Sequence, residues 1–172
     1  WNRKTWVLAG PVILSNISVP LLGAVDTAVV GHLPGPHYLG AVAVGALIFS
    51  VIYGGCNFLR MGTTGLTAQS VGAGDADQVR SWLARAGLLA FAVGILLIAL
   101  QGPVIWVALK IVNPSAQVAP LTDGYFSIRI WGAPFALLNF ALLGWFFGIQ
   151  NTRAALATQV IMNGVNIVLD LW

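Results

Sequence analysis

Apolar residues in this chain occur in long runs, which only short polar or Gly/Pro-rich segments interrupt. Crossing the hydrocarbon core of a bilayer takes about 20 mostly apolar residues in helical form. We therefore expect five membrane-spanning helices, at about residues 6–33, 38–71, 81–109, 121–147 and 152–172. The pattern predicts an all-α polytopic membrane protein. The fifth run is still apolar at Trp172, so we interpret the chain as a piece of a longer protein, truncated within helix five.

Composition and charge support a membrane protein and exclude several other classes. Hydrophobic residues make up 58% of the chain and charged residues 8%, whereas soluble domains carry roughly 25% charged residues. The basic residues form no cluster longer than Arg3-Lys4, so we expect no nucleic-acid partner. Cys56 is the single cysteine, which excludes an internal disulfide.

The positions of lysine and arginine predict the orientation in the membrane, because cytoplasmic loops are enriched in these residues. Only Lys110 falls in the connections on one side of the predicted bundle. The other side carries Arg3, Lys4, Arg80, Arg85 and Arg153. We therefore expect the N-terminus to be cytoplasmic.

The fifth predicted helix carries a stripe of polar residues. These residues recur every three or four positions and so share one helical face: Gln159, Asn163, Asn166 and Asp170. A charged side chain at mid-membrane costs at least about 2.5 kcal/mol, so a carboxylate here indicates a proton or cation function. The structural alternative is a hydrogen-bonded seam between helices, which amides commonly form in membranes.

The first predicted helix contains a second carboxylate, Asp26, followed by Thr27. Pro11 and Pro20 each remove a backbone donor and are candidate hinges in this helix. A rise of 1.5 Å per residue places Asp26 and Asp170 roughly 33 and 26 Å from the basic side. We expect both carboxylates in the outer half of the membrane, where they could share one proton or one Na⁺. The alternative for Asp26 is a structural role, capping a helix or pairing with an arginine.

The second predicted helix has a polar stripe of its own, formed by Tyr53, Asn57, Arg60, Thr64 and Thr67. We expect Tyr53 and Asn57 to line a cavity and Arg60 to reach toward the cytoplasmic side. Arg129 in the fourth helix is predicted near the outer side, with structural and functional roles both open.

Known enzyme patterns are missing from this sequence. It has no phosphate-binding Gly-x-x-x-x-Gly-Lys-[Ser/Thr] loop and, lacking glutamate, no His-Glu-x-x-His zinc motif. Val25-Asp26 and Leu169-Asp170 differ from the Tyr-Asp and Gly-x-Gly-Asp of intramembrane aspartyl proteases. We predict a transporter without a cofactor, and not an enzyme.

Three blocks of sequence resemble the multidrug and toxic compound extrusion (MATE) family, and within it the DinF-like branch. They are NISVPLLGAVDTAVVGHL at residues 16–33, RMGTTGLTAQSVGAGD at 60–75, and NGVNIVLD at 163–170. The resemblance implies a twelve-helix protein of two six-helix lobes, of which this chain would form most of the N-terminal lobe. Its remaining partner in the fold would be the C-terminal lobe of the same protein.

The same resemblance implies export of organic, often cationic and amphipathic, compounds in exchange for H⁺ or Na⁺. Asp26 matches the central coupling aspartate of the family, and Asn166 and Asp170 match residues of the same cavity. Cation binding there is proposed to bend helix one near its proline, for which Pro11 and Pro20 are the candidates. The expected location is the bacterial inner membrane. Two alternatives stay open, a lipid-linked-sugar flippase of the same superfamily and a non-transporting membrane scaffold.

Overall fold

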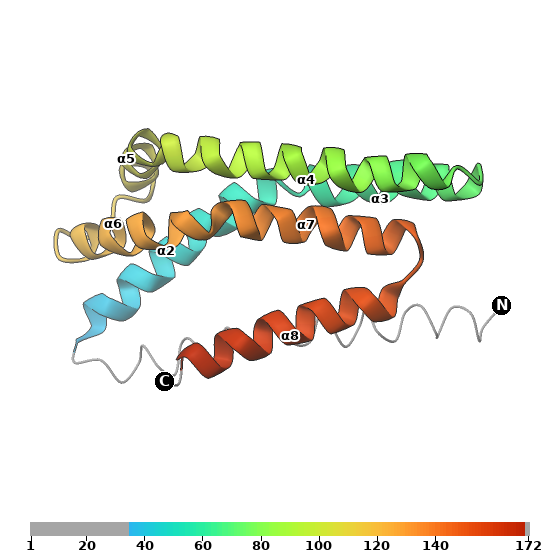
Figure 1. Cartoon of the computed structure of the whole chain (residues 1–172). Helices are drawn as coiled ribbons and strands as arrows, with labels where there is room; N and C mark the ends of the chain where they lie inside the picture. Colours follow the sequence, from blue (N-terminus) through green and yellow to red (C-terminus); the bar gives the residue numbers. More distant parts are fainter. Residues whose placement is uncertain (1–34, 171–172) are drawn as a thin grey trace.

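The computed structural model describes residues 35–170, and within α8 it describes only the backbone of residues 166, 167, 169 and 170. Every regular element in this described range is helical (Figure 1). In chain order they are α2 (Pro36–Gly55), α3 (Phe58–Gly72), α4 (Ala76–Ala99), α5 (Gln101–Val112), α6 (Val118–Arg129), the 3₁₀ turn η1 (Ile130–Gly132), α7 (Ala133–Gly148) and α8 (Thr152–Asp170). Three helical stretches within this range are long and apolar enough to cross a membrane, Pro36–Gly72, Ala76–Ala99 and Val118–Gly148. The helix predicted at 6–33 lies outside the described residues.

The helix predicted at 38–71 is divided in the structure into α2 and α3. At the junction the backbone forms hydrogen bonds that span three residues, not the four of an α-helix. Asn57 N bonds to the Gly54 carbonyl at 3.2 Å, and Leu59 N bonds to the Cys56 carbonyl at 3.0 Å. A glycine pair, Gly54-Gly55, precedes the junction, and such pairs are a common cause of helix kinks. Asn57 therefore lies where the two segments meet.

The helix predicted at 81–109 also differs from the structure at both ends. It begins at Ala76 because Asp75 caps it, accepting a hydrogen bond from Gln78 N at 2.9 Å. It is interrupted at Leu100, and α5 leaves at an angle to α4 (Figure 1). Pro103 explains the kink, since proline lacks the N–H group and its ring clashes with the carbonyl four residues earlier.

The run predicted at 121–147 consists of α6 and α7 joined by η1. Pro134 cannot donate a backbone hydrogen bond, and the chain compensates with a tight turn in which Ala133 N bonds to the Ile130 carbonyl. The following helix, α8, begins after Asn151, whose side-chain oxygen accepts a hydrogen bond from Ala154 N at 3.1 Å. This cap fixes the start of the helix that carries the predicted site.

Small residues allow α7 to lie close to both α3 and α4. Gly94 of α4 lies directly against the backbone of Pro134. A Cβ atom built on Gly144 would lie 2.5 Å from the Arg60 carbonyl oxygen of α3. Such close backbone approach through glycine is typical of membrane helix interfaces. The outward surface instead carries large apolar side chains such as Leu88, 73% exposed, which suits contact with lipid.

Candidate functional site

Two polar residues of α8, Asn163 and Gln159, lie toward the inside of the bundle. Asn163 is 7% exposed, and Gln159, one turn earlier, is half-buried. Val160, Ile161 and Val165 are exposed, at 49%, 64% and 53%. At these positions the helix presents Asn163 and Gln159 to the protein and aliphatic side chains outward.

Asn166 and Asp170 follow Asn163 by three and seven residues in the sequence, a spacing that predicts a shared helical face. Their side chains lie outside what the structure describes. Asp26, Thr27, Pro11 and Pro20 lie outside the described residues altogether. The predicted convergence of the two carboxylates therefore stays a prediction, and so does a Na⁺ site on Asp26, Asn166 and Asp170.

Tyr53 belongs to a row of aromatic rings that links α2, α6 and α7. Phe49 stacks on Phe126 with 5.0 Å between ring centroids. Tyr53 lies 5.6 Å from Phe49 and meets the edge of Phe140 at 6.2 Å. Asn57 is half-buried one turn further along, at the α2–α3 junction. Phe49 and Phe126 are buried, at 2% and 1% exposed, so the row packs α2 against α6 and α7 and holds Tyr53 in a fixed position.

Arg129 lies at the outer edge of this aromatic row. Its guanidinium is 5.2 Å from the ring centroid of Phe49 and 5.5 Å from that of Tyr125, and it donates a hydrogen bond to the Tyr125 hydroxyl. Within the described part of the chain it forms no ion pair with Asp123. Aromatic faces and a phenol oxygen thus solvate this cation, favouring the structural role among the two that the sequence left open.

Asn139 was not found by the sequence analysis. Its side-chain oxygen is buried on α7 and has no hydrogen-bond partner among the described residues. An acceptor in this state carries a desolvation cost, so it is a candidate to orient a polar ligand. The available signal was a single amide in the otherwise apolar run 133–148. Because no second polar residue follows at helical spacing, the sequence showed no polar face there and predicted no site.

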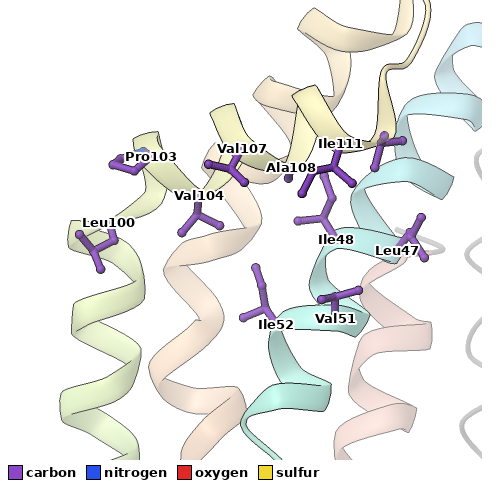
Figure 2. Close-up of a pocket in the computed structure, with 11 residues that line it drawn as sticks. Leu47, Ile48, Val51, Ile52, Leu100, Pro103, Val104, Val107, Ala108 and Ile111 are labelled. Carbon is purple, nitrogen blue, oxygen red and sulfur yellow. The ribbon is translucent and has the colours of Figure 1, made fainter.

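A large hollow among the described residues is apolar and is unsuited to a cation. It has a volume of about 540 Å³ and lies between α2 and α5, next to the end of α4 (Figure 2). Its side chains are all aliphatic: Leu47, Ile48, Val51, Ile52, Leu100, Pro103, Val104, Val107, Ala108, Ile111 and Val112. The described residues also contain no cluster of three or more His, Cys, Asp or Glu that could hold a metal.

The family model named MatE matches residues 11–172 of this chain. The chain belongs to the MatE family. Among curated proteins it is 47% identical over 171 residues to DNA damage-inducible protein F of Escherichia coli, a match that covers 99% of this chain and 37% of that protein. A probable multidrug resistance protein NorM of Caulobacter vibrioides is 30% identical over 168 residues, covering 95% of this chain and 35% of that protein.

Solved structures of the family share the fold. An outward-facing MATE family transporter superimposes with a TM-score of 0.87 at 23% identity, over 97% of this chain and 37% of that one. A transporter from Pyrococcus furiosus, described as having a binding pocket of reverse polarity, gives a TM-score of 0.85 at 25% identity over the same shares. These matches confirm the predicted family and the predicted fold class. The chain spans about 37% of the length of these MatE relatives.

Proposed function

We propose that this chain forms part of an antiporter that exports organic compounds, often cationic and amphipathic, in exchange for H⁺ or Na⁺. The observation that carries the proposal is the inward-facing polar face of α8, with Asn163 buried and aliphatic residues outside. Such a face in a membrane bundle needs a polar occupant or a polar partner. Membership in the MatE family makes a transported ion and substrate the natural occupants.

In the proposed mechanism Asp26 and Asp170 are ionised when the cavity opens outward, and they accept a proton or a Na⁺ ion. Two nearby carboxylates in a low-dielectric site repel each other, so one of them binds a proton readily. Asn166, Asn163 and Gln159 supply neutral oxygens or orient water. Neutralising the charge weakens the hold on a cationic substrate and favours the alternative conformation of helix one, hinged at Pro11 or Pro20. The ion shifts this equilibrium only through its different affinities for the two states.

We place the protein in a bacterial inner membrane with its N-terminus in the cytoplasm. The described contacts support this orientation, because Trp145 near the end of α7 donates a hydrogen bond to the Val79 carbonyl at the start of α4, at 2.9 Å. Arg80, Arg85 and Arg153 therefore gather at one end of the bundle. Lys110 lies at the end of α5, beyond the kink. This asymmetry is what the positive-inside rule requires.

The test of the proposal is efflux of a fluorescent organic cation from vesicles that contain the full-length protein carrying this sequence. Export under an imposed pH gradient alone identifies H⁺ as the coupling ion, and export under a Na⁺ gradient alone identifies Na⁺. Transport that responds to neither gradient would contradict coupled antiport. It would favour one of the two alternatives, a flippase or a scaffold.

A first prediction concerns Asn163. We expect Asn163→Leu to reduce gradient-driven efflux by about tenfold, because it removes a buried polar group from the proposed ion path while keeping a similar volume. Val160→Leu is the matched control: Val160 lies on the exposed side of the same helix, and its efflux should equal that of the wild type. Equal efflux in both variants would assign Asn163 to helix packing.

A further inference from the structure

A second, smaller hollow lies between α3 and α4 and combines apolar walls with a cation. It has a volume of about 220 Å³. Phe58 and Leu66 of α3 and Leu89 of α4 form its walls, and Arg85 lines it from α4. Gly62 borders open space in this groove. A Cβ atom added to this residue would meet no other atom within 4 Å, so a larger side chain there would extend into the groove. The result is an apolar groove with a positive charge beside it.

A chain of contacts between the two helices holds this cation in place. The Arg85 guanidinium lies 5.1 Å from the ring centroid of Trp82, within the range of a cation–π interaction. Trp82 in turn donates a hydrogen bond from its indole nitrogen to the Ser70 hydroxyl at 3.1 Å. That hydroxyl donates to the Leu66 carbonyl at 3.1 Å. The ring beneath the guanidinium is thus fixed to α3, and the arginine has an ordered support.

The charge of Arg85 is not balanced by a carboxylate in the structure, which records no ion pair for it within the described residues. Arg85 is exposed and is the tenth residue of α4, so its Cα lies about 14 Å from the start of that helix. Its side chain leans toward the N-terminal end of α4 and can reach the level of the lipid headgroups. An anionic group at this level of the membrane would complement it.

The dimensions of the groove limit what can occupy it. Pockets for drug-sized molecules measure about 300–1,000 Å³, and this groove is smaller. Thr63 is the one hydroxyl in its lining, and that group already donates to the Leu59 carbonyl at 2.6 Å. Apart from Arg85, the lining therefore offers contact to a narrow apolar chain and no free hydrogen-bond donor to a polar body.

We propose that this groove binds one anionic phospholipid, with an acyl chain between α3 and α4 and the phosphate on Arg85. The bilayer supplies such molecules at high local concentration, and the apolar walls and the cation match the two halves of the ligand. Anionic lipids are attracted by basic residues near the cytoplasmic surface. Arg85 lies on the side of the bundle where Arg80 and Arg153 also gather.

Native mass spectrometry of the full-length protein tests the proposal. The protein is incubated in detergent with equal amounts of phosphatidylglycerol and phosphatidylcholine that carry identical acyl chains, and retained lipids are counted. The wild type should retain phosphatidylglycerol preferentially. Arg85→Gln should reduce that preference about fivefold, the effect of one basic residue at a membrane surface. Gly62→Leu should reduce retention of both lipids, because its side chain fills the groove.

Arg80→Gln is the matched control, since it removes a positive charge from the same helix at a position that does not line the groove. Its preference for phosphatidylglycerol should fall by less than that of Arg85→Gln. An unchanged preference in Arg85→Gln overturns the assignment of the phosphate. Unchanged retention in Gly62→Leu overturns the assignment of the acyl chain, and it would indicate that another segment of protein covers the groove. Arg85→Gln keeps the test decisive should Gly62→Leu fail to fold.

Discussion

Asp26→Asn is expected to abolish ion-driven export. In the full-length protein, this substitution should lower the gradient-dependent efflux of a fluorescent cation by at least about tenfold. A side chain that no longer binds the ion differently in the two conformations of the transporter cannot shift the equilibrium between them. Asparagine keeps the size and polarity of the side chain and removes its negative charge and its titration. Packing around helix one should therefore be retained while coupling is lost.

The matched control for this experiment is Asp123→Asn. Asp123 is an exposed carboxylate on α6 and has no ion pair within the described residues, so its loss changes the net charge equally without touching the proposed ion path. Efflux in this control should equal that of the wild type. The thermal unfolding midpoint of the Asp26→Asn protein, which should equal that of the wild type, separates lost coupling from misfolding. Wild-type efflux from the Asp26→Asn protein would remove this residue from its proposed role.

The transmembrane helices could be predicted from sequence because their signal is local. A run of about 20 apolar residues is sufficient to identify a span. The breaks within them were not predicted, because hydropathy does not change where a helix bends. Pro103 and Pro134 stand close to two of the breaks, but membrane helices tolerate proline when neighbouring groups satisfy the backbone. Whether a given proline bends its helix depends on tertiary contacts, which the sequence does not display.

The predicted site depends on information of two kinds. The inward face of α8 follows from helical spacing, and the burial of Asn163 agrees with it. The predicted proximity of Asp26 to Asp170 depends instead on how two distant helices pack, which periodicity cannot supply. The same limit explains Arg129, whose aromatic neighbours include Phe49, eighty residues earlier in the chain. Asn139 was missed because the prediction of a polar face depends on polar residues that recur at helical spacing, and a single amide does not recur.

The close packing of α4 on α7 leads to the largest expected effect on stability. A Cβ atom on Gly94 would lie 2.7 Å from the backbone nitrogen of Pro134 and 2.9 Å from its Cβ atom, and closer still to its Cα. A flexible side chain could rotate away from such a contact, but a backbone cannot. We expect Gly94→Ala to separate the two helices and to lower the unfolding free energy by about 2–3 kcal/mol, the upper part of the range for overpacked cores.

Gly87→Ala provides the control, because Gly87 lies two turns earlier on the same helix and its added Cβ would meet the Leu138 side chain at an ordinary 3.7 Å. Both substitutions gain about 1 kcal/mol of helix propensity, so the difference between them isolates the contact with Pro134. Thermal unfolding of the full-length protein, followed at one heating rate, should show a lower midpoint for Gly94→Ala and an unchanged or higher one for Gly87→Ala. Equal midpoints would mean that α4 and α7 pack less closely at Pro134 than described.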